Sequence, residues 1–224
     1  MTRAALRGHE LQRYIMWTYY MLRGGMAVIA FLLPVVLLVG GRQTWPGAQP
    51  ASISGYYHTA MRDVFVGALV TVGVFLVLYR AFNKVENWLL NIAGLAVICV
   101  ALLPCGRDQG STDAVGQFTA AQAHGICAMV AFGCLAVVAI FLGRDTVNLL
   151  PDKPTQRLYR GVYIGLGIAM IAMPAAALWL TRTNASSLFW VETAALWVFA
   201  SYWMVKTQEC RRVEADIKAM TGSF

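Results

Sequence analysis

The chain has 224 residues, of which 58% are hydrophobic and 13% charged, and its formal net charge is +7. A soluble domain carries about 25% charged residues, so this composition excludes an ordinary soluble protein and indicates an integral membrane protein. The apolar runs are continuous and do not alternate with polar residues, which favours membrane helices over a membrane barrel. The positive charge lies outside the apolar runs, and no nucleic acid partner is expected from it.

The first 24 residues combine four arginines with aromatic and aliphatic side chains. Two interpretations stay open for this amphipathic segment, 1–24. It either lies along the headgroups as a separate interfacial helix or forms the hydrated end of one long helix. In both cases the first membrane span is predicted at about 25–39.

Five further apolar runs follow, and a helix needs about 20 residues to cross the hydrocarbon core. The predicted spans are 60–79, 86–103, 123–142, 158–180 and 187–205, followed by a polar tail, 206–224. The predicted fold class is therefore all-α, a single transmembrane domain, 1–224, built as a bundle of six helices. Its five cysteines form no even-numbered framework, and no obligatory disulfide is expected.

The Lys and Arg residues divide unevenly between the two sides of this bundle. Fourteen of the 18 lie in the N-terminal segment, the 80–86 link, the 143–160 loop and the tail, and four lie on the other side. Positive charge concentrates in cytoplasmic segments, so both termini are predicted to be cytoplasmic. The expected location is a cell membrane, most simply a bacterial inner membrane, with the lipid bilayer as the constant partner.

The most polar run in the chain, 52–63, leads directly into an apolar run, 64–79, that has only 16 residues. The second span must therefore begin inside the polar run, which brings Arg62 and Asp63 to the edge of the membrane. Charged groups at that depth are costly and mark a candidate functional site.

Counting about 20 residues back from the cytoplasmic ends places three more polar residues on the same side. His58 and His124 fall at the outer boundary, and Glu192 falls roughly 9 Å inside it, at about 1.5 Å per residue. We therefore predict one polar site opening to the extracytoplasmic leaflet, with His58, Asp63, His124 and Glu192 as catalytic candidates. No comparable group of buried ionisable residues is expected in the cytoplasmic half.

This single site requires the second, fourth and sixth spans to be neighbours at their outer ends. Glu192 needs a partner inside the bundle, and Arg62 or a histidine is expected to supply it. Glu86, by contrast, is expected at a hydrated helix end.

The remaining candidates are substrate-binding residues. Arg62 would hold an anionic headgroup, and Ser54, Tyr56 and Tyr57 would complete the set. Simpler interpretations stay open for all of them: histidines that bond headgroups, an Arg62–Asp63 ion pair, and tyrosines of an interfacial belt.

Three chemistries fit these residue types. His58, His124 and Asp63 match the two-histidine-plus-carboxylate set of catalytic zinc. A haem between His58 and His124 is the weaker fit, because a ring near the membrane surface would lie partly in water. Glu192, Asp63 and Arg62 would suit a proton relay.

The spacing Ser54-Gly-Tyr-Tyr-His58 resembles the Ser-x3-His motif of the alkaline ceramidase and adiponectin-receptor-like superfamily. The resemblance implies lipid-amide hydrolysis at a zinc surrounded by three His, an Asp and a Ser. That superfamily has seven helices and a late HxxxH pair, which this chain lacks. The run SISGYYHTAMRDVFVG also resembles one carried by uncharacterised bacterial six-helix membrane proteins.

The predicted function is the handling or hydrolysis of a lipid or amphiphile at this outer site, with zinc as the candidate metal. The alternative is a non-catalytic subunit of a membrane complex, or a small proton-linked carrier, in which the same residues are structural or form a relay. Homo- and hetero-oligomers both remain open.

Overall fold

The computed structural model describes residues 3–44, 47, 49–81, 83–106, 119–183 and 187–221. These residues form helices and no strand, which confirms the all-α prediction. The elements in chain order are α1 (Arg3–Thr44), the 3-10 turn η1 (Ser54–His58), α2 (Arg62–Leu78), α3 (Lys84–Leu102), α4 (Ala120–Val137), the π-helical turn η2 (Val138–Leu142), α5 (Arg144–Val147), α6 (Lys153–Thr183) and α7 (Leu188–Thr221).

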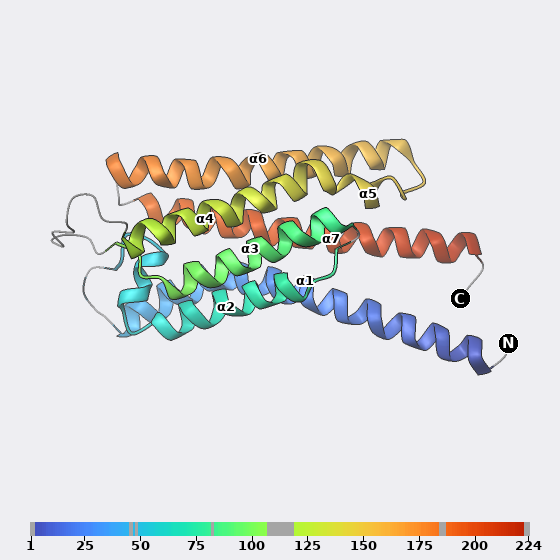
Figure 1. Cartoon of the computed structure of the whole chain (residues 1–224), viewed down its shortest axis with the longest axis horizontal. Coiled ribbons are helices and arrows are strands. Elements are labelled where there is room, and N and C mark those ends of the chain that lie inside the picture. The colour runs from blue at the N-terminus through green and yellow to red at the C-terminus, as the bar shows by residue number, and fades with distance from the viewer. Residues whose placement is uncertain are drawn as a thin grey trace.

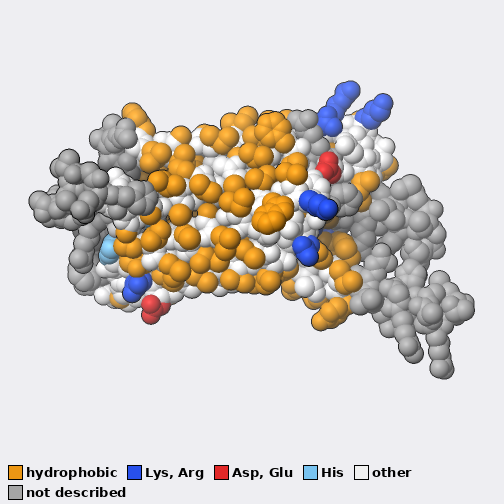
Figure 2. Space-filling model, in the orientation of Figure 1, with side chains coloured by type: hydrophobic (Ala, Val, Ile, Leu, Met, Phe, Trp, Pro, Cys, Tyr) orange, Lys and Arg blue, Asp and Glu red, His pale blue; other side chains and the backbone are white. Residues whose placement is uncertain are grey.

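Membrane character is plain in the long helices. Among the described residues, five segments are long and apolar enough to cross a membrane: Tyr14–Thr44, Lys84–Leu102, Ala120–Val147, Lys153–Leu180 and Leu188–Val213. Helix α2 has 17 residues, at the lower limit of about 17–25 for a span, so a sixth span stays a prediction. Figure 2 shows apolar side chains covering the middle of the visible face, with charged side chains at its margins.

The long helices α1, α2, α3, α4, α6 and α7 are arranged as a ring in chain order. Each packs mainly on the helix before and after it, and α1 packs on α7 to close the ring. The predicted direct contact of α2, α4 and α7 is therefore wrong. These helices are separated by α1, α3 and α6, and they face one another only across the middle of the ring.

We name the two ends of the bundle by what they carry. The loop end holds η1, residues 103–106 and the start of α4. The tail end holds the α2–α3 link, α5 and the start of α6, with α1 and α7 extending beyond it (Figure 1). Because the ring contains an even number of long helices, the beginning of α1 and the end of α7 lie at the same end.

Several boundaries differ from the prediction. Helix α1 runs without interruption through Gly24 and Gly25, which matches the interpretation as one long helix. The polar tail, 206–224, was expected to extend the last helix, and it does continue α7 as far as Thr221. The π-helical turn η2 and the short α5 were not predicted, because neither changes the apolar periodicity over enough residues to be seen.

Helices α2 and α3 approach so closely that only glycine fits at their crossing. A Cβ added to Gly73 would lie 2.7 Å from the backbone oxygen of Gly94, and one added to Gly94 would lie 2.6 Å from that of Gly73. Real Cβ atoms do not come this close to a backbone oxygen, so alanine at either position must force the helices apart. Small residues at such crossings are the usual means of tight helix packing in membranes.

The tail end contains a buried charge cluster that the sequence analysis did not anticipate. Four of its side chains are less than a tenth exposed: Arg23, Glu86, Lys206 and Glu209. Lys206 Nζ lies 3.2 Å from Glu209 Oε2. Glu86 is therefore buried and does not lie at a hydrated helix end. The expectation that this half holds no buried ionisable group is wrong.

Tyrosines complete this tail-end charge cluster. The hydroxyl of Tyr163 donates to Glu209, and Lys206 donates to Thr146 Oγ1. Arg23 donates to the Tyr79 hydroxyl from Nε at 3.1 Å and from Nη2 at 2.5 Å. A tyrosine hydroxyl can both donate and accept a hydrogen bond, so it can partner a buried charge from another helix. The sequence alone did not identify these tyrosines as partners.

Candidate functional site

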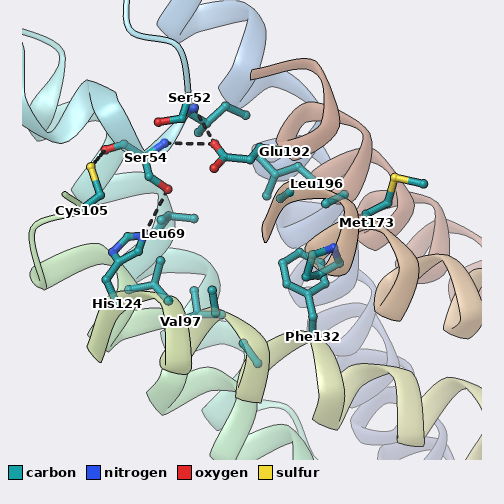
Figure 3. A pocket seen from close by; sticks show the side chains of 18 of the residues that line it. Ser52, Ser54, Leu69, Val97, Cys105, His124, Phe132, Met173, Glu192 and Leu196 are labelled. Atoms are coloured by element: carbon teal, nitrogen blue, oxygen red, sulfur yellow. Dashed lines mark hydrogen bonds between the residues drawn. The ribbon is translucent and has the colours of Figure 1, made fainter. Parts of the chain in front are cut away.

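The ring surrounds a partly open cavity of about 430 Å³ that extends from the loop end toward the middle of the bundle. All the long helices contribute to its wall, and most of the lining is aliphatic or aromatic. Five polar or thiol side chains line it, and they gather at the loop end: Ser52, Ser54, Cys105, His124 and Glu192 (Figure 3). Ligand pockets of about 300–1,000 Å³ typically combine an apolar wall with a few convergent polar groups.

The segment from Ala51 to Ser54 is fixed to the beginning of α7. The backbone N–H of Phe189 donates to the Ala51 oxygen at 2.8 Å. Glu192 Oε2 accepts from the N–H of Ile53 at 2.6 Å and from that of Ser54 at 3.3 Å. These two amides precede or begin the η1 turn, where the turn itself supplies them with no acceptor.

The partner of Glu192 is therefore the backbone of a neighbouring segment. The expected pairing with Arg62 or a histidine is wrong. A carboxylate can be held by several N–H donors without any cation, because such bonds favour its charged form. Sequence spacing gives no sign of this partner, since any residue carries a backbone N–H.

His124 joins the same segment from the opposite wall. Its Nδ1 lies 3.0 Å from the Leu103 oxygen, and its Nε2 lies 3.2 Å from Ser54 Oγ. A carbonyl oxygen can only accept, so Nδ1 carries the hydrogen. In the neutral imidazole Nε2 then accepts from the Ser54 hydroxyl. Ser54 thus stands between His124 and Glu192, as Figure 3 shows.

The Cys105 thiol also holds Ser54 in place. Its Sγ donates to the Ser54 backbone oxygen at 3.0 Å. Three elements therefore hold Ser54. Helix α7 bonds its backbone N–H, the segment after α3 bonds its backbone oxygen, and α4 bonds its hydroxyl. This explains how a residue in a short turn is held in the cavity wall.

His58, Arg62 and Asp63 lie outside the cavity. His58 is exposed, and its Nε2 donates to the Cys105 oxygen at 2.9 Å. Arg62 is exposed, stacks on the Tyr57 ring at 4.5 Å and donates to its hydroxyl at 2.9 Å. Asp63 is exposed in the first turn of α2, where a negative charge suits the helix dipole.

The two predicted substrate-binding tyrosines have separate surroundings. Tyr57 donates to the Leu102 oxygen at 3.2 Å, which ties η1 to the end of α3. Tyr56 is fully buried, packs near Phe189 and donates to Gln49 Oε1 at 3.3 Å. Neither side chain lines the cavity. Of the predicted site residues, the structure brings together only Ser54, His124 and Glu192 there.

The predicted zinc set is not assembled. Across the described ranges, no group of three or more His, Cys, Asp or Glu side chains lies close enough to hold a metal ion. His124 has both ring nitrogens engaged inside the cavity, whereas His58 and Asp63 are on the exposed surface of η1 and α2. A haem held by His58 and His124 does not fit either, because the two rings do not face a common space.

Helix α4 also carries a pattern that sequence analysis did not use. Ala121, Gly125 and Ala128 line the cavity at intervals of four and three residues, on the same side as His124. Such spacing places residues on one helix face, and small side chains there leave room for the cavity. The lining from α6 had no comparable signal, because Met173, Pro174 and Ala177 resemble ordinary lipid-facing residues.

No family model matches the chain, and no curated protein and no solved structure matches it either. The two resemblances drawn from the Ser54–His58 region therefore stay predictions. The structure does show that Ser54 Oγ faces His124, and that His58, four residues on, bonds a backbone oxygen instead.

Proposed function

We propose that this chain is a membrane protein that binds a single amphiphile in its central cavity. The apolar part of the ligand would occupy the wall formed by α4, α6 and α7, and its polar head would meet Ser54, His124 and Glu192. The observation that carries the proposal is the division of one cavity into a long apolar wall and a polar group at one end. A ligand with the same division fits both parts.

Access from the bilayer supports an amphiphile over a water-soluble ligand. Two residues that line the cavity are also exposed on the outer surface: Met129 of α4 is 40% exposed and Leu178 of α6 is 48% exposed. The cavity wall between α4 and α6 is therefore also a lipid-facing surface. A chain-bearing molecule can move between bilayer and cavity along this side without crossing water.

The proposal is tested by filling the cavity. Gly125 lines it, and a Cβ built there meets nothing within 4 Å, so Gly125→Phe can project into the space without backbone strain. Gly133 is the matched control: it lies on the same helix, has equal room and is not part of the lining. Purified protein in a non-ionic detergent is titrated with a fluorescent single-chain amphiphile. Gly125→Phe should abolish saturable binding, and Gly133→Phe should keep it; equal binding by both variants contradicts the proposal.

A second candidate function, hydrolysis, is favoured by one observation. Ser54 Oγ and His124 Nε2 are 3.2 Å apart, and the Leu103 oxygen orients the imidazole. This is the arrangement of a nucleophile and its base. Ser54 Oγ would attack an ester carbonyl carbon while its proton passes to Nε2. The leaving alcohol would take that proton, and water would then release the acyl group. A fluorophosphonate probe should modify Ser54 and spare Ser52; no adduct at Ser54 rejects hydrolysis.

We also propose that the loop end faces away from the cytoplasm, in a bacterial inner membrane. The support is the distribution of Lys and Arg, which favours the tail-end segments fourteen to four. The alternative roles, a complex subunit or a proton-linked carrier, use the same residues without ligand turnover, and the amphiphile titration separates them from the leading proposal.

A further inference from the structure

The polar end of the cavity has acidic rather than basic character among the described residues. Glu192 is the one acidic side chain that lines the cavity, and the described lining includes no Lys or Arg. The arginine expected to receive an anionic headgroup, Arg62, stacks on Tyr57 outside the cavity. An anionic head would therefore meet a carboxylate with no compensating cation among these residues, which is unfavourable where little water separates them.

The hydrogen-bonding groups at this end also disfavour an anionic head. Glu192 Oε2 is occupied by two backbone N–H groups, whereas Oε1 has no partner among the described residues and is not one of their buried unpartnered atoms. Oε1 is therefore accessible. A carboxylate oxygen can only accept hydrogen bonds, so Oε1 offers an acceptor and a negative charge to a ligand.

Of the other two groups, Ser54 offers an acceptor and His124 does not. Ser54 gives its hydroxyl hydrogen to His124 and keeps its oxygen lone pairs. His124 uses both ring nitrogens, one for Ser54 and one for the Leu103 oxygen. Of the polar side chains at this end, Ser52 alone keeps a neutral hydroxyl hydrogen, since its Oγ accepts from the Gly55 N–H. A head group that donates therefore finds acceptors at both Glu192 and Ser54, whereas a head group that only accepts finds a donor at Ser52 alone.

We propose that the ligand is a single-chain primary amine, whose ammonium head binds between Glu192 Oε1 and Ser54 Oγ. The inference rests on the proposed binding function and specifies its ligand class. An ammonium group brings three donors and one positive charge to a place that offers acceptors and one negative charge. Charge-assisted bonds of this kind are roughly twice as strong as neutral ones. The apolar wall then takes the alkyl chain, as for any amphiphile.

The test compares head groups on one chain. Dodecylamine, dodecanol, dodecanoate and dodecyltrimethylammonium compete with the fluorescent amphiphile on the full-length protein in a non-ionic detergent. The amine should bind about tenfold or more tighter than the alcohol, as expected for a hydrogen bond to a charged group. The carboxylate should bind weakest. The trimethylammonium compound should bind less well than the amine, because it has the charge without N–H donors.

Glu192→Gln should reduce the amine-to-alcohol preference to near unity, because it removes the charge that distinguishes an ammonium head from a hydroxyl head. Thr193→Val is the matched control, because Thr193 is the next residue on α7, bonds the Phe189 oxygen and does not line the cavity. It should keep the preference. The wild-type comparison stands without any variant, so a poorly folding Glu192→Gln protein does not weaken the test. Equal affinities for amine and alcohol, or a preference for the carboxylate, overturn the amine inference and leave amphiphile binding intact. No saturable binding of any compound overturns both.

Discussion

The two ends of the bundle both bury polar groups, but they satisfy them in different ways. At the loop end, side chains bond the backbone: Glu192 holds two N–H groups and His124 holds a carbonyl oxygen. At the tail end, side chains bond one another: Lys206 pairs with Glu209, and Arg23 pairs with Tyr79. The loop end lies on a cavity, and the tail-end groups named here do not line it.

By this difference we distinguish a binding site at the loop end from a structural group at the tail end. The tail-end charge cluster is called the tail-end clamp below. Charged side chains at the tail end are paired with other side chains. Aromatic rings fill the space around them, as Tyr79 does against Trp203. Side chains that bond backbone keep capacity on their other atoms, as Glu192 does on Oε1. Buried charge by itself therefore does not identify a functional site; unused capacity facing a cavity does.

The proposed orientation places the two ends on opposite sides of the membrane, and its test should give an all-or-none result. A cysteine at Gln49, in a Cys105→Ser background that removes the native loop-end thiol, should react with an impermeant thiol reagent added to intact cells. A cysteine at Lys153 should react only after the cells are opened. The reverse pattern would turn the loop end toward the cytoplasm and contradict the charge-based orientation.

Breaking the tail-end clamp should have the largest effect on stability. Glu209→Gln leaves Lys206 buried without its counter-charge, and such changes cost about 3–5 kcal/mol. Glu209 Oε1 already lacks a partner among the described residues, so the group depends on Lys206 and Tyr163 through its other oxygen. Unfolding in mixed micelles measures the loss. The double variant Lys206→Met/Glu209→Leu should recover much of it, and a double variant as unstable as Glu209→Gln would show that the charge pair is not the cause.

Glu192→Gln should lower the free energy of unfolding less than Glu209→Gln does, and it should lower the affinity for the amine. The amide oxygen of Gln can still accept from Ile53 or Ser54, so the loss is that of a hydrogen bond to a charged group, about 1.5–3 kcal/mol. The same unfolding assay gives the stability change, and the amine titration gives the change in affinity. If Glu192→Gln destabilises as much as Glu209→Gln and leaves amine affinity unchanged, the distinction between site and clamp fails.

The smallest effect is expected at Arg62. Its stacking on Tyr57 is exposed, where a cation–π contact is worth about 0.5–1 kcal/mol. Arg62→Ala should lower stability by no more than this and leave amphiphile affinity unchanged, in both the unfolding and the competition assays. A marked fall in affinity would place Arg62 in the binding site after all.

The sequence predicts the long apolar helices well, because such a helix is a composition of about 20 residues and needs no partner to be recognised. It predicts that burying an ionisable side chain such as that of Glu192 is unfavourable, but it does not predict which group that side chain bonds. Glu192 bonds backbone amides, and these are present in almost every residue, so the side-chain sequence does not reveal them. The tail-end cluster was missed because Lys206 and Glu209 lie near the end of an apolar run, where they resemble the beginning of a hydrated tail. The separation of His58 from His124 depends on the η1 turn, and turn geometry is not contained in spacing along a helix.

The contact between α1 and α7 has a consequence for how the protein is made. Because the helices follow the ring in chain order, each new helix can dock on the one before it as soon as it leaves the insertion machinery. The wall that contains Glu192 arrives last, and until then the N–H groups of Ile53 and Ser54 lack the acceptor that they have in the finished ring. A chain interrupted before Leu188 has five of the six long helices and leaves the place of α7 open. That place can be filled by its own α7 or by α7 of a second copy, which makes helix exchange between two chains the natural assembly error of this architecture.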